Sequence, residues 1–206
     1  MTNAAQSAPC DYQVSVLRFP EDVPRWNLVH GFLAYRKQIF VDRMEWDLHN
    51  HEGIEFEQYD APNQTIYVIA HRDGVIIGGA RLRRTDAEFG QGAIRYSYMI
   101  RDACRGLLDG MPTDLCWNTP PVDRDVWELT RFAADQEPGL AEAILRAAND
   151  FIHGKGGFDC LFLGPPAFMR MAKKLGWAPE ALGPISGNHD GRFLAFKCAV
   201  MPPAAN

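Results

Sequence analysis

Two apolar runs on either side of Asp73-Gly74 constrain the fold more than any other part of the chain. Residues 65–71 and 75–83 both have the composition of β-strands, and Arg72-Asp73-Gly74 joins them. Asp-Gly suits the tight two-residue turn of a hairpin, because both positions of that turn need a positive φ. The sequence therefore predicts a sheet with at least one antiparallel pair of strands.

The other expected elements do not alternate regularly between strand and helix. Apolar residues recur at steps of three and four over residues 25–41 and 140–153, which predicts two amphipathic helices. Further strands are expected at residues 12–17, 93–99, 126–133, 158–163 and 193–200, and further helices at 102–108 and 166–175. This order predicts an α/β (α+β) fold with a single mixed, largely antiparallel sheet flanked by helices. We expect residues 1–206 to form one domain with loose ends at 1–10 and 201–206.

Composition narrows the class of protein. The 206 residues include 21 Lys+Arg and 26 Asp+Glu, a net charge of −5, which favours neither nucleic acid nor an anionic membrane as a partner. No apolar run is long enough to span a bilayer, and the first residues do not resemble a secretion signal. Five scattered cysteines predict reduced thiols in a cytoplasmic protein. His49 and His51 have no third ligand at a recognisable spacing, so we expect no metal.

Charged residues within apolar segments are the candidates for a site. Glu128 and Arg131 lie in the strand expected at 126–133, where a charge is costly to bury unless it is paired. A spacing of three places them on opposite faces of a regular strand, so a bulge or the end of the strand must intervene if they act together. They are therefore either a satisfied structural pair or part of a site. Residues 42–60 read as a long loop of the kind that is usually functional or mobile.

An ordered set of motifs resembles the LuxI-type acyl-homoserine lactone synthases, the autoinducer synthases. The motifs are Arg36-x3-Phe40-x5-Trp46, Glu57-Gln58-Tyr59-Asp60, Gly78-Gly79-Ala80-Arg81-Leu82 and Trp127-Glu128-Leu129-Thr130-Arg131-Phe132. The resemblance implies a fold like that of the GCN5-related N-acetyltransferases. It also implies synthesis of an N-acyl-L-homoserine lactone, a quorum-sensing signal, from S-adenosylmethionine and an acyl thioester. The thioester is carried by acyl carrier protein or coenzyme A, methylthioadenosine is released, and S-adenosylmethionine is a substrate, so no cofactor is expected.

The resemblance assigns roles to individual residues. The implied catalytic residues are Glu128 and Arg131, and the implied S-adenosylmethionine-binding residues are Arg36, Phe40, Trp46, Glu57, Asp60 and Arg81. Aromatic rings suit the adenine and the sulfonium, and an arginine fork, from Arg36 or Arg131, suits the carboxylate. The acidic side chains suit the ammonium or brace the arginines. Glu128 is the expected proton acceptor, and backbone N–H groups near residues 96–100 are the expected donors to the oxyanion.

The acyl pocket is the least specific part of the resemblance. Cys104 stands where the family usually has Phe, and Phe162 and Phe168 are expected to narrow the pocket, although both are equally plausible as core residues. Two other functions stay open. The first is an N-acyltransferase that acts on another amine without forming a lactone, and the second is a non-catalytic binding protein. Release of methylthioadenosine separates the synthase from both.

Overall fold

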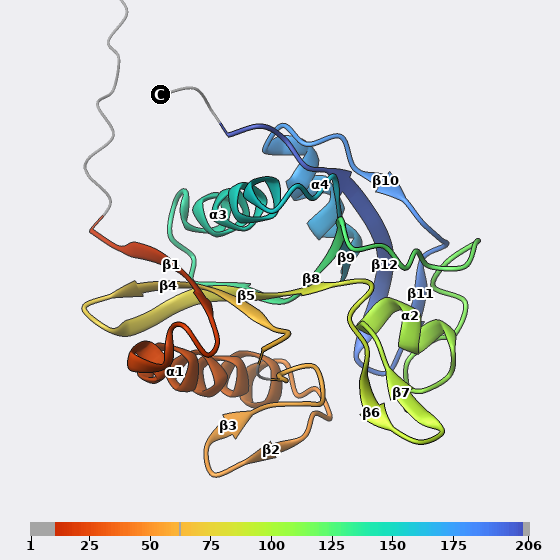
Figure 1. The fold of residues 1–206 in the computed structure, drawn as a ribbon, viewed down its shortest axis with the longest axis horizontal. Helices are drawn as coiled ribbons and strands as arrows, with labels where there is room; N and C mark the ends of the chain where they lie inside the picture. Colours follow the sequence, from red (N-terminus) through yellow and green to blue (C-terminus); the bar gives the residue numbers. More distant parts are fainter. Residues whose placement is uncertain (1–10, 62, 204–206) are drawn as a thin grey trace, which may run out of the picture.

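One mixed sheet organises the protein (Figure 1). The computed structural model describes residues 11–61 and 63–203. The eight strands of the main sheet are β1 (Gln13–Arg18), β4 (Ile66–Arg72), β5 (Val75–Arg84), β8 (Val126–Ala134), β9 (Asp159–Gly164), β10 (Glu180–Ala181), β11 (Ser186–Asn188) and β12 (Gly191–Ala199). Their order is β1-β4-β5-β8-β9-β12-β10, with β11 paired to β12. Most neighbours are antiparallel, and β8 with β9 is a parallel pair, which confirms the predicted fold class.

The hairpin predicted from Asp-Gly is formed by β4 and β5. Asp73 has φ 50° and Gly74 has φ 85°, the positive values that a tight turn of this kind requires. The strongest local signal in the sequence therefore predicted two neighbouring strands of the main sheet correctly.

Helices cover both faces of the sheet (Figure 1). They are η1 (Val23–Arg25), α1 (Trp26–Arg36), the π-helical segment η2 (Lys37–Arg43), α2 (Met99–Cys104), α3 (Leu140–Gly154) and α4 (Pro166–Lys174). Strand β4 shows how the faces are divided, because Tyr67 and Ile69 pack with α1 whereas Val68 and Ala70 pack with α3. Such alternation is the period of a strand that is buried on both sides.

Strands β8 and β9 separate in the middle of the sheet. They pair over Val126–Leu129 against residues 159–162, and β8 continues to Ala134 without further pairing to β9. The parallel pair is connected by α3, the usual kind of crossover for parallel strands. The gap that this separation leaves is the place where the large cavity described below is found.

Some elements differ from the expectation. The strand expected at 93–99 is only β7 (Ile94–Tyr96), which pairs with β6 (Phe89–Gln91) in a separate hairpin. The strand cannot continue to residue 99, because Tyr98 caps α2 and Met99 begins it. The helix expected at 102–108 is α2, which starts earlier and ends at Cys104.

Short strands occur in two places where none was expected. The loop at 42–60 contains the hairpin of β2 (Asn50–His51) and β3 (Ile54–Glu55), and β10 and β11 pair with β12. Of the predicted loose ends at 1–10 and 201–206, residues 1–10 and 204–206 lie outside the described residues. Residues 201–203 are described and form no helix or strand, but the backbone of Met201 is hydrogen-bonded to the side chain of Asn149.

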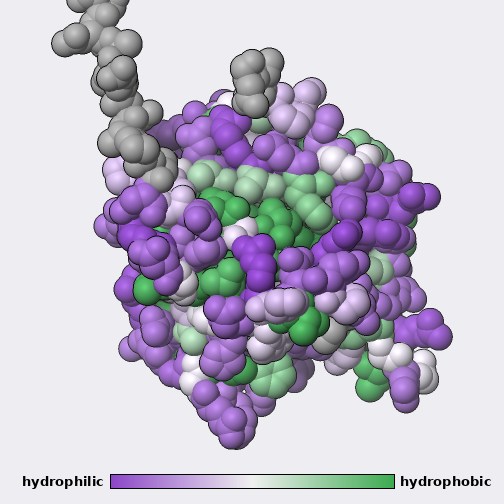
Figure 2. All heavy atoms as spheres, turned by 60° about the vertical axis from the view of Figure 1, so that its left-hand side comes forward, coloured by the Kyte–Doolittle hydropathy of each residue, from purple (hydrophilic) through white to green (hydrophobic). Residues whose placement is uncertain are grey.

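The face of the molecule drawn in Figure 2 is mainly hydrophilic. Figure 2 shows polar residues over most of one face, with apolar residues gathered in a hollow near its centre. Among the described residues, none of the helices is long and apolar enough to cross a membrane.

The close packing of α1 on the sheet predicts a strong response at Gly79. A Cβ at this position would lie 2.6 Å from the ring of Phe32 and 2.7 Å from the Val68 carbonyl oxygen. We expect Gly79→Ala to lower the free energy of unfolding by roughly 1–3 kcal/mol through overpacking. Gly154→Ala is the control, because no atom lies within 4 Å of its added Cβ. Thermal unfolding measures both, and equal midpoints for the two variants would contradict this packing.

Candidate active site

A ring of six buried or nearly buried charges lies between α1 and the sheet. Its members alternate in sign, so that every arginine touches two carboxylates and every carboxylate touches two arginines. In order around the ring they are Arg36, Glu55, Arg131, Glu57, Arg81 and Asp60. Three positive and three negative charges cancel, which is the condition under which charged side chains can be buried together.

One half of the ring is centred on Arg36 in the last turn of α1. Its Nε donates to Glu55 Oε2 at 2.5 Å, and its two Nη groups donate to the two oxygens of Asp60 at 2.7 and 2.9 Å. This two-pronged contact is the geometry in which arginine binds carboxylates most strongly. The hydroxyl of Tyr67 also donates to Asp60, at 3.1 Å. Arg36 and Glu55 are both fully buried, so this half of the ring is inaccessible to solvent.

The other half of the ring is centred on Glu57. Arg81 Nη2 donates to Glu57 Oε1 at 2.5 Å, and Arg131 Nη2 donates to Glu57 Oε2 at 2.8 Å. Arg131 Nε closes the ring on Glu55 at 3.3 Å, and Arg81 Nη1 lies 3.1 Å from Asp60. The side chain of Glu57 is 16% exposed, whereas the side chains of Glu55 and Asp60 are at most 4% exposed. Glu57 is therefore the carboxylate of the ring that a ligand can reach.

A bulge in β8 brings Arg131 into the ring. Arg81 on β5 lies opposite Thr130, but the register then shifts, so that Gly79 lies opposite Ala133. Arg131 has φ 52°, a left-handed conformation that is uncommon for a residue other than glycine. Because the extra residue reverses the alternation of side chains, Arg131 reaches the face that carries Arg81. A bulge, one of the two irregularities considered for the spacing of Glu128 and Arg131, is therefore present, and it brings Arg131 to Arg81 and Glu57.

Neighbouring arginines keep two carboxylates of the ring, Asp60 and Glu57, ionised. Burial by itself raises the pKa of Asp60, but Arg81 and Arg36 outweigh it and hold that pKa well below its usual value. In the same way, the effect of Arg131 and Arg81 exceeds that of burial and lowers the pKa of Glu57. Both carboxylates are thus anionic at neutral pH and poor proton acceptors.

Two stacked aromatic rings lie beside the charges. Phe40 in η2 and Trp46 in the loop after it have ring centroids 5.2 Å apart and an interplanar angle of 15°. The guanidinium carbon of Arg131 lies 5.9 Å from the centre of the Phe40 ring. The wider π-helical turns, marked by the bond from the Met44 N–H to the Ile39 carbonyl, change the direction of the chain between α1 and the loop. Such segments frequently occur at functional sites.

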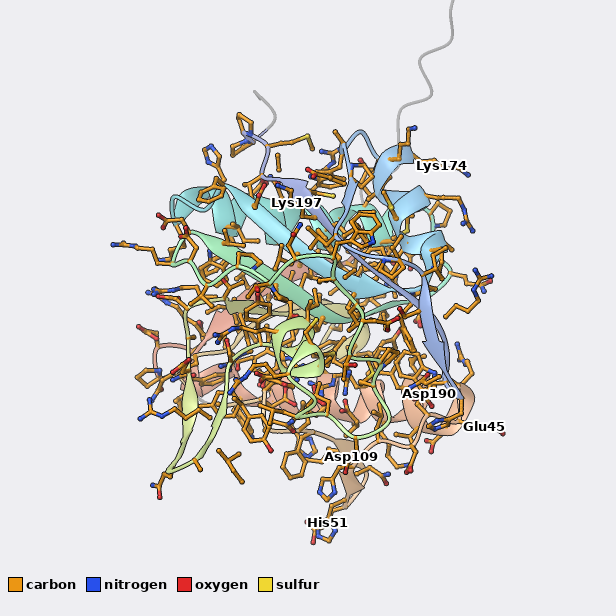
Figure 3. All side chains as sticks on the ribbon, turned by 90° about the vertical axis from the view of Figure 1, so that its right-hand side faces the viewer. Glu45, His51, Asp109, Lys174, Asp190 and Lys197 are labelled. Carbon is orange, nitrogen blue, oxygen red and sulfur yellow. The ribbon has the colours of Figure 1, made fainter. Side chains whose placement is uncertain are left out.

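The large cavity opens between the separated strands, with a volume of about 760 Å³. Its lining includes Phe40, Trp46, Glu57 and Arg131. Further parts of the lining are residues 129–134 of β8, residues 163–165 at the end of β9, one side of α4, residues 107–111 and the turn between β11 and β12. This volume is in the range of small-molecule sites. Asp109 and Asp190, which also line the cavity, lie on the side of the molecule that faces the viewer in Figure 3.

The remaining predicted residues support the cavity from behind. Arg36, Asp60 and Arg81 are not among the described residues that line it, and they act by holding Glu57 and Arg131 in place. The eight positions implied by the family resemblance thus divide into a lining group and a bracing group, with Glu128 apart from both.

Glu128 has a different set of partners from Arg131. Its Oε2 accepts the N–H of Met99 at 2.9 Å, and its Oε1 accepts the N–H of Ile100 at 2.8 Å. Burial raises the pKa of Glu128 to about 7, although the two N–H donors act in the opposite direction. Met99 lines the cavity, whereas Glu128 is not among the described residues that line it. The Glu128 carboxyl group therefore lies behind Met99, just outside the cavity.

Three of the N–H groups expected as oxyanion donors near residues 96–100 already have carboxylate partners. The N–H groups of Met99 and Ile100, at the start of α2, donate to Glu128, and the N–H of Ser97 donates to Asp102 at 2.7 Å. For the other residues of this segment the expectation stays a prediction.

The three residues expected in the acyl pocket lie in different places. Phe168 on α4 lines the cavity. Phe162 and Cys104 are not among the described residues that line it. Phe162 stacks on Phe196, with centroids 4.9 Å apart, and Cys104 packs against the apolar cluster around Tyr98.

Sequence reasoning missed Glu55 and Phe132. Glu55 ends β3 and Glu57 follows two residues later, the spacing at which side chains share a side in extended chain, so this spacing was a usable signal. Phe132 follows Arg131 in the cavity wall and stacks on Phe168, with centroids 5.1 Å apart. Its place depends on the bulge, which the sequence required only if Glu128 and Arg131 act together. Among the described residues, no group of three or more His, Cys, Asp or Glu side chains is arranged to hold a metal ion.

Comparisons with known proteins first give the class of fold. An acyl-CoA N-acyltransferase from Pseudomonas aeruginosa superposes with a TM-score of 0.60 over 90% of this chain and 98% of its own, at 10% identity. The sheet that separates in its middle therefore has the fold of the GCN5-like N-acetyltransferases.

The family follows from closer matches. Residues 25–155 match the autoinducer synthase family, so the chain belongs to that family. An acyl-homoserine-lactone synthase from Pseudomonas aeruginosa is 31% identical over 156 residues, covering 73% of this chain and 68% of the relative. The solved structure of the CoA-dependent acyl-homoserine lactone synthase BjaI with SAM and isopentyl-CoA has a TM-score of 0.76 at 16% identity, over 92% of this chain and 84% of its own.

The closed ring predicts that loss of one carboxylate is severe. We expect Asp60→Asn to lower the free energy of unfolding by about 3–5 kcal/mol, because Arg36 and Arg81 then lose a buried partner. Asp42→Asn is the matched control, because Asp42 pairs with Lys37 at the exposed surface and contributes at most about 1 kcal/mol. Denaturant unfolding at pH 7 compares the two, and a loss at Asp60 no larger than that at Asp42 would rule out a ring that stabilises the fold.

The raised pKa of Glu128 predicts a pH dependence of stability. A carboxyl group whose folded pKa lies above its unfolded value stabilises the fold at low pH, and that contribution is lost as pH rises through the folded pKa. We therefore expect the wild type to lose stability relative to Glu128→Gln between about pH 4.5 and about pH 7. Glu180→Gln, at an exposed position, should show no such trend relative to the wild type. A carboxyl ¹³C titration that gave Glu128 a midpoint near 4.5 would contradict the prediction.

Proposed function

We propose that this protein makes an N-acyl-L-homoserine lactone from S-adenosylmethionine and an acyl thioester, and releases methylthioadenosine. The observation that carries the proposal is the wall of one cavity that brings together Glu57, Arg131, Phe40 and Trp46 at the point where β8 and β9 separate. Membership of the autoinducer synthase family supports it. An N-acyltransferase of the same fold that acts on another amine has no need of this combination of ion ring and aromatic stack.

The cavity wall matches the groups of S-adenosylmethionine. Arg131 suits the carboxylate better than Arg36 does, because Arg131 lines the cavity whereas Arg36 is fully buried and occupied by Glu55 and Asp60. Glu57 stays anionic and suits the α-ammonium. The faces of Phe40 and Trp46 suit the adenine or the sulfonium, which an aromatic face attracts electrostatically.

The acyl thioester fits between the separated strands. Beyond Leu129 the edge of β8 no longer pairs with β9, and residues 129–134 line the cavity. Unpaired backbone donors and acceptors along this edge suit an extended acyl-carrying arm, in the way that a peptide adds to the edge of a sheet. The apolar side chains of Phe132, Phe168 and Met171 then surround the acyl group.

The reaction proceeds in two steps. The amine nitrogen, after loss of a proton, attacks the thioester carbon and expels the thiol of the carrier. The carboxylate oxygen then attacks the γ-carbon and expels methylthioadenosine, a displacement that depends mainly on holding a bent conformer. Glu128 is the proposed proton acceptor, through a bridging water, because its pKa of about 7 suits proton transfer at neutral pH whereas the pKa of Glu57 is lowered.

The surface charges suit the two substrates at different places. Asp109 and Asp190 at the cavity favour the cationic S-adenosylmethionine, while Arg170, Lys173 and Lys174 at the end of α4 favour an anionic carrier. Figure 3 shows Lys174 well away from Asp109 and Asp190. Acyl carrier protein and coenzyme A are both anionic, so both stay candidates as donor.

Three further parts of the proposal concern the chain as a whole. It acts as one domain, because β1 and β12, from opposite ends of the sequence, belong to one sheet. It uses no resident cofactor, since S-adenosylmethionine is consumed. It works in the cytoplasm, where its thiols stay reduced.

The test is mass spectrometry of the products. Purified protein is incubated with S-adenosylmethionine and a panel of acyl-carrier-protein and acyl-coenzyme-A thioesters. We expect equal amounts of methylthioadenosine and an N-acyl-homoserine lactone, and the productive thioester identifies the carrier. Arg131→Gln should reduce turnover at least 100-fold, because it removes a charge from the cavity wall, whereas Arg124→Gln at the exposed surface should not. Acylated product without methylthioadenosine would replace the proposal by the plain N-acyltransferase.

A further inference from the structure

A second, smaller space lies behind the main cavity, under α3 and α4. Its volume is about 20 Å³, and it is lined by Leu129, Leu145, Ala148, Asn149, Ile152, Cys160, Phe162, Phe168, Ala172, Trp177, Cys198, Ala199 and Val200. Leu129 and Phe168 line both spaces. The ring of Phe168 is thus a partition with the substrate cavity on one side and the apolar core on the other.

Neighbouring residues hold this partition from several directions. Phe132 stacks on the Phe168 ring at 5.1 Å and 14° between planes, and Phe162 and Phe196 meet it edge-on at 5.4 and 5.6 Å. Gly164 leaves room for the ring, because a Cβ there would lie 2.9 Å from its Cδ1. A ring packed on so many sides has little freedom to swing away, so it forms a fixed wall.

The space behind the wall is suited to hydrocarbon. Among the described residues of its lining, Asn149 has the one amide side chain, and the backbone of Met201 already occupies that amide. Asn149 Nδ2 donates to the Met201 carbonyl at 2.8 Å, and Asn149 Oδ1 accepts the Met201 N–H at 2.9 Å. A methylene chain that entered would therefore displace no hydrogen bond of the lining amide.

We propose that Phe168 sets the upper length of the acyl group by separating the substrate cavity from this apolar space. The inference rests on the proposed function and deepens it. Without the Phe168 ring, the substrate cavity gains the volume of the ring and the small space behind it. The protein then accepts acyl groups that are several methylenes longer. Phe162 does not take part in the wall, because it lines only the space behind it.

The test compares two phenylalanines of the same cluster. The kcat/KM is measured for straight saturated acyl donors of increasing length, on the carrier that the wild type uses. For Phe168→Ala we expect the preferred length to increase and kcat/KM for a donor two methylenes beyond the wild-type optimum to rise roughly tenfold or more. Phe162→Ala is the matched control. It enlarges the rear space and removes one edge contact of the Phe168 ring, but the stacked Phe132 and the edge of Phe196 still hold that ring, so the variant should keep the wild-type preference.

The possible outcomes distinguish a failure of the proposal about Phe168 from a failure of the proposed function. An unchanged length preference in folded Phe168→Ala, or the same change in Phe162→Ala, overturns the proposal. If Phe168→Ala does not fold, Phe168→Leu replaces it with the same expected direction. If the wild type releases no methylthioadenosine with any donor, the proposed function fails. Calorimetric binding of N-acyl-homoserine lactones of increasing length then tests the wall without turnover, and tighter binding of the longer chains by the Phe168 variant alone supports it.

Discussion

The closed ring of six charges is the interaction on which the rest of the site depends. It joins the end of α1, the segment around β3, strand β5 and the bulge of β8, which are distant in sequence. An unpaired buried charge costs several kcal/mol, so none of these segments can leave the ring without penalising the others. The same contacts that fix these segments also present Glu57 and Arg131 to the cavity. Stability and substrate recognition therefore rest on one set of side chains.

The separation of β8 from β9 and the bulge at Arg131 are two aspects of one departure from a regular sheet. Up to Leu129, β8 pairs on both sides, and beyond it the strand pairs only with β5 through a shifted register. The shift sends Arg131 to the face of the ring and leaves Phe132 to stack on Phe168 at the opposite face. A single extra residue thus supplies both a polar and an apolar wall of the cavity, which is a recognised use of bulges next to active sites.

The sequence predicts local features well and long-range placement poorly. Asp73-Gly74 defined its hairpin, and helical spacing located α1 and α3, because these signals depend on neighbouring residues alone. The separate hairpin of β6 and β7 was missed because strand propensity does not say which sheet a strand joins. The motifs named most of the ring but not Glu55. Phe162 and Phe168 look alike in sequence, and which of them lines the cavity is decided by how α4 packs against β9.

A closed ring also limits how the sequence can change over time. In an isolated ion pair, arginine and glutamate can exchange places and the contact survives. In this ring each residue has two neighbours of opposite sign, so an exchange at any one pair sets two like charges against each other at its ends. Every exchange of two neighbouring charges in the ring therefore produces a variant in which like charges repel each other. A change of charge at any one of the six positions therefore has to be matched around the whole ring, whereas Phe132 and Phe168 in the apolar wall carry no such constraint.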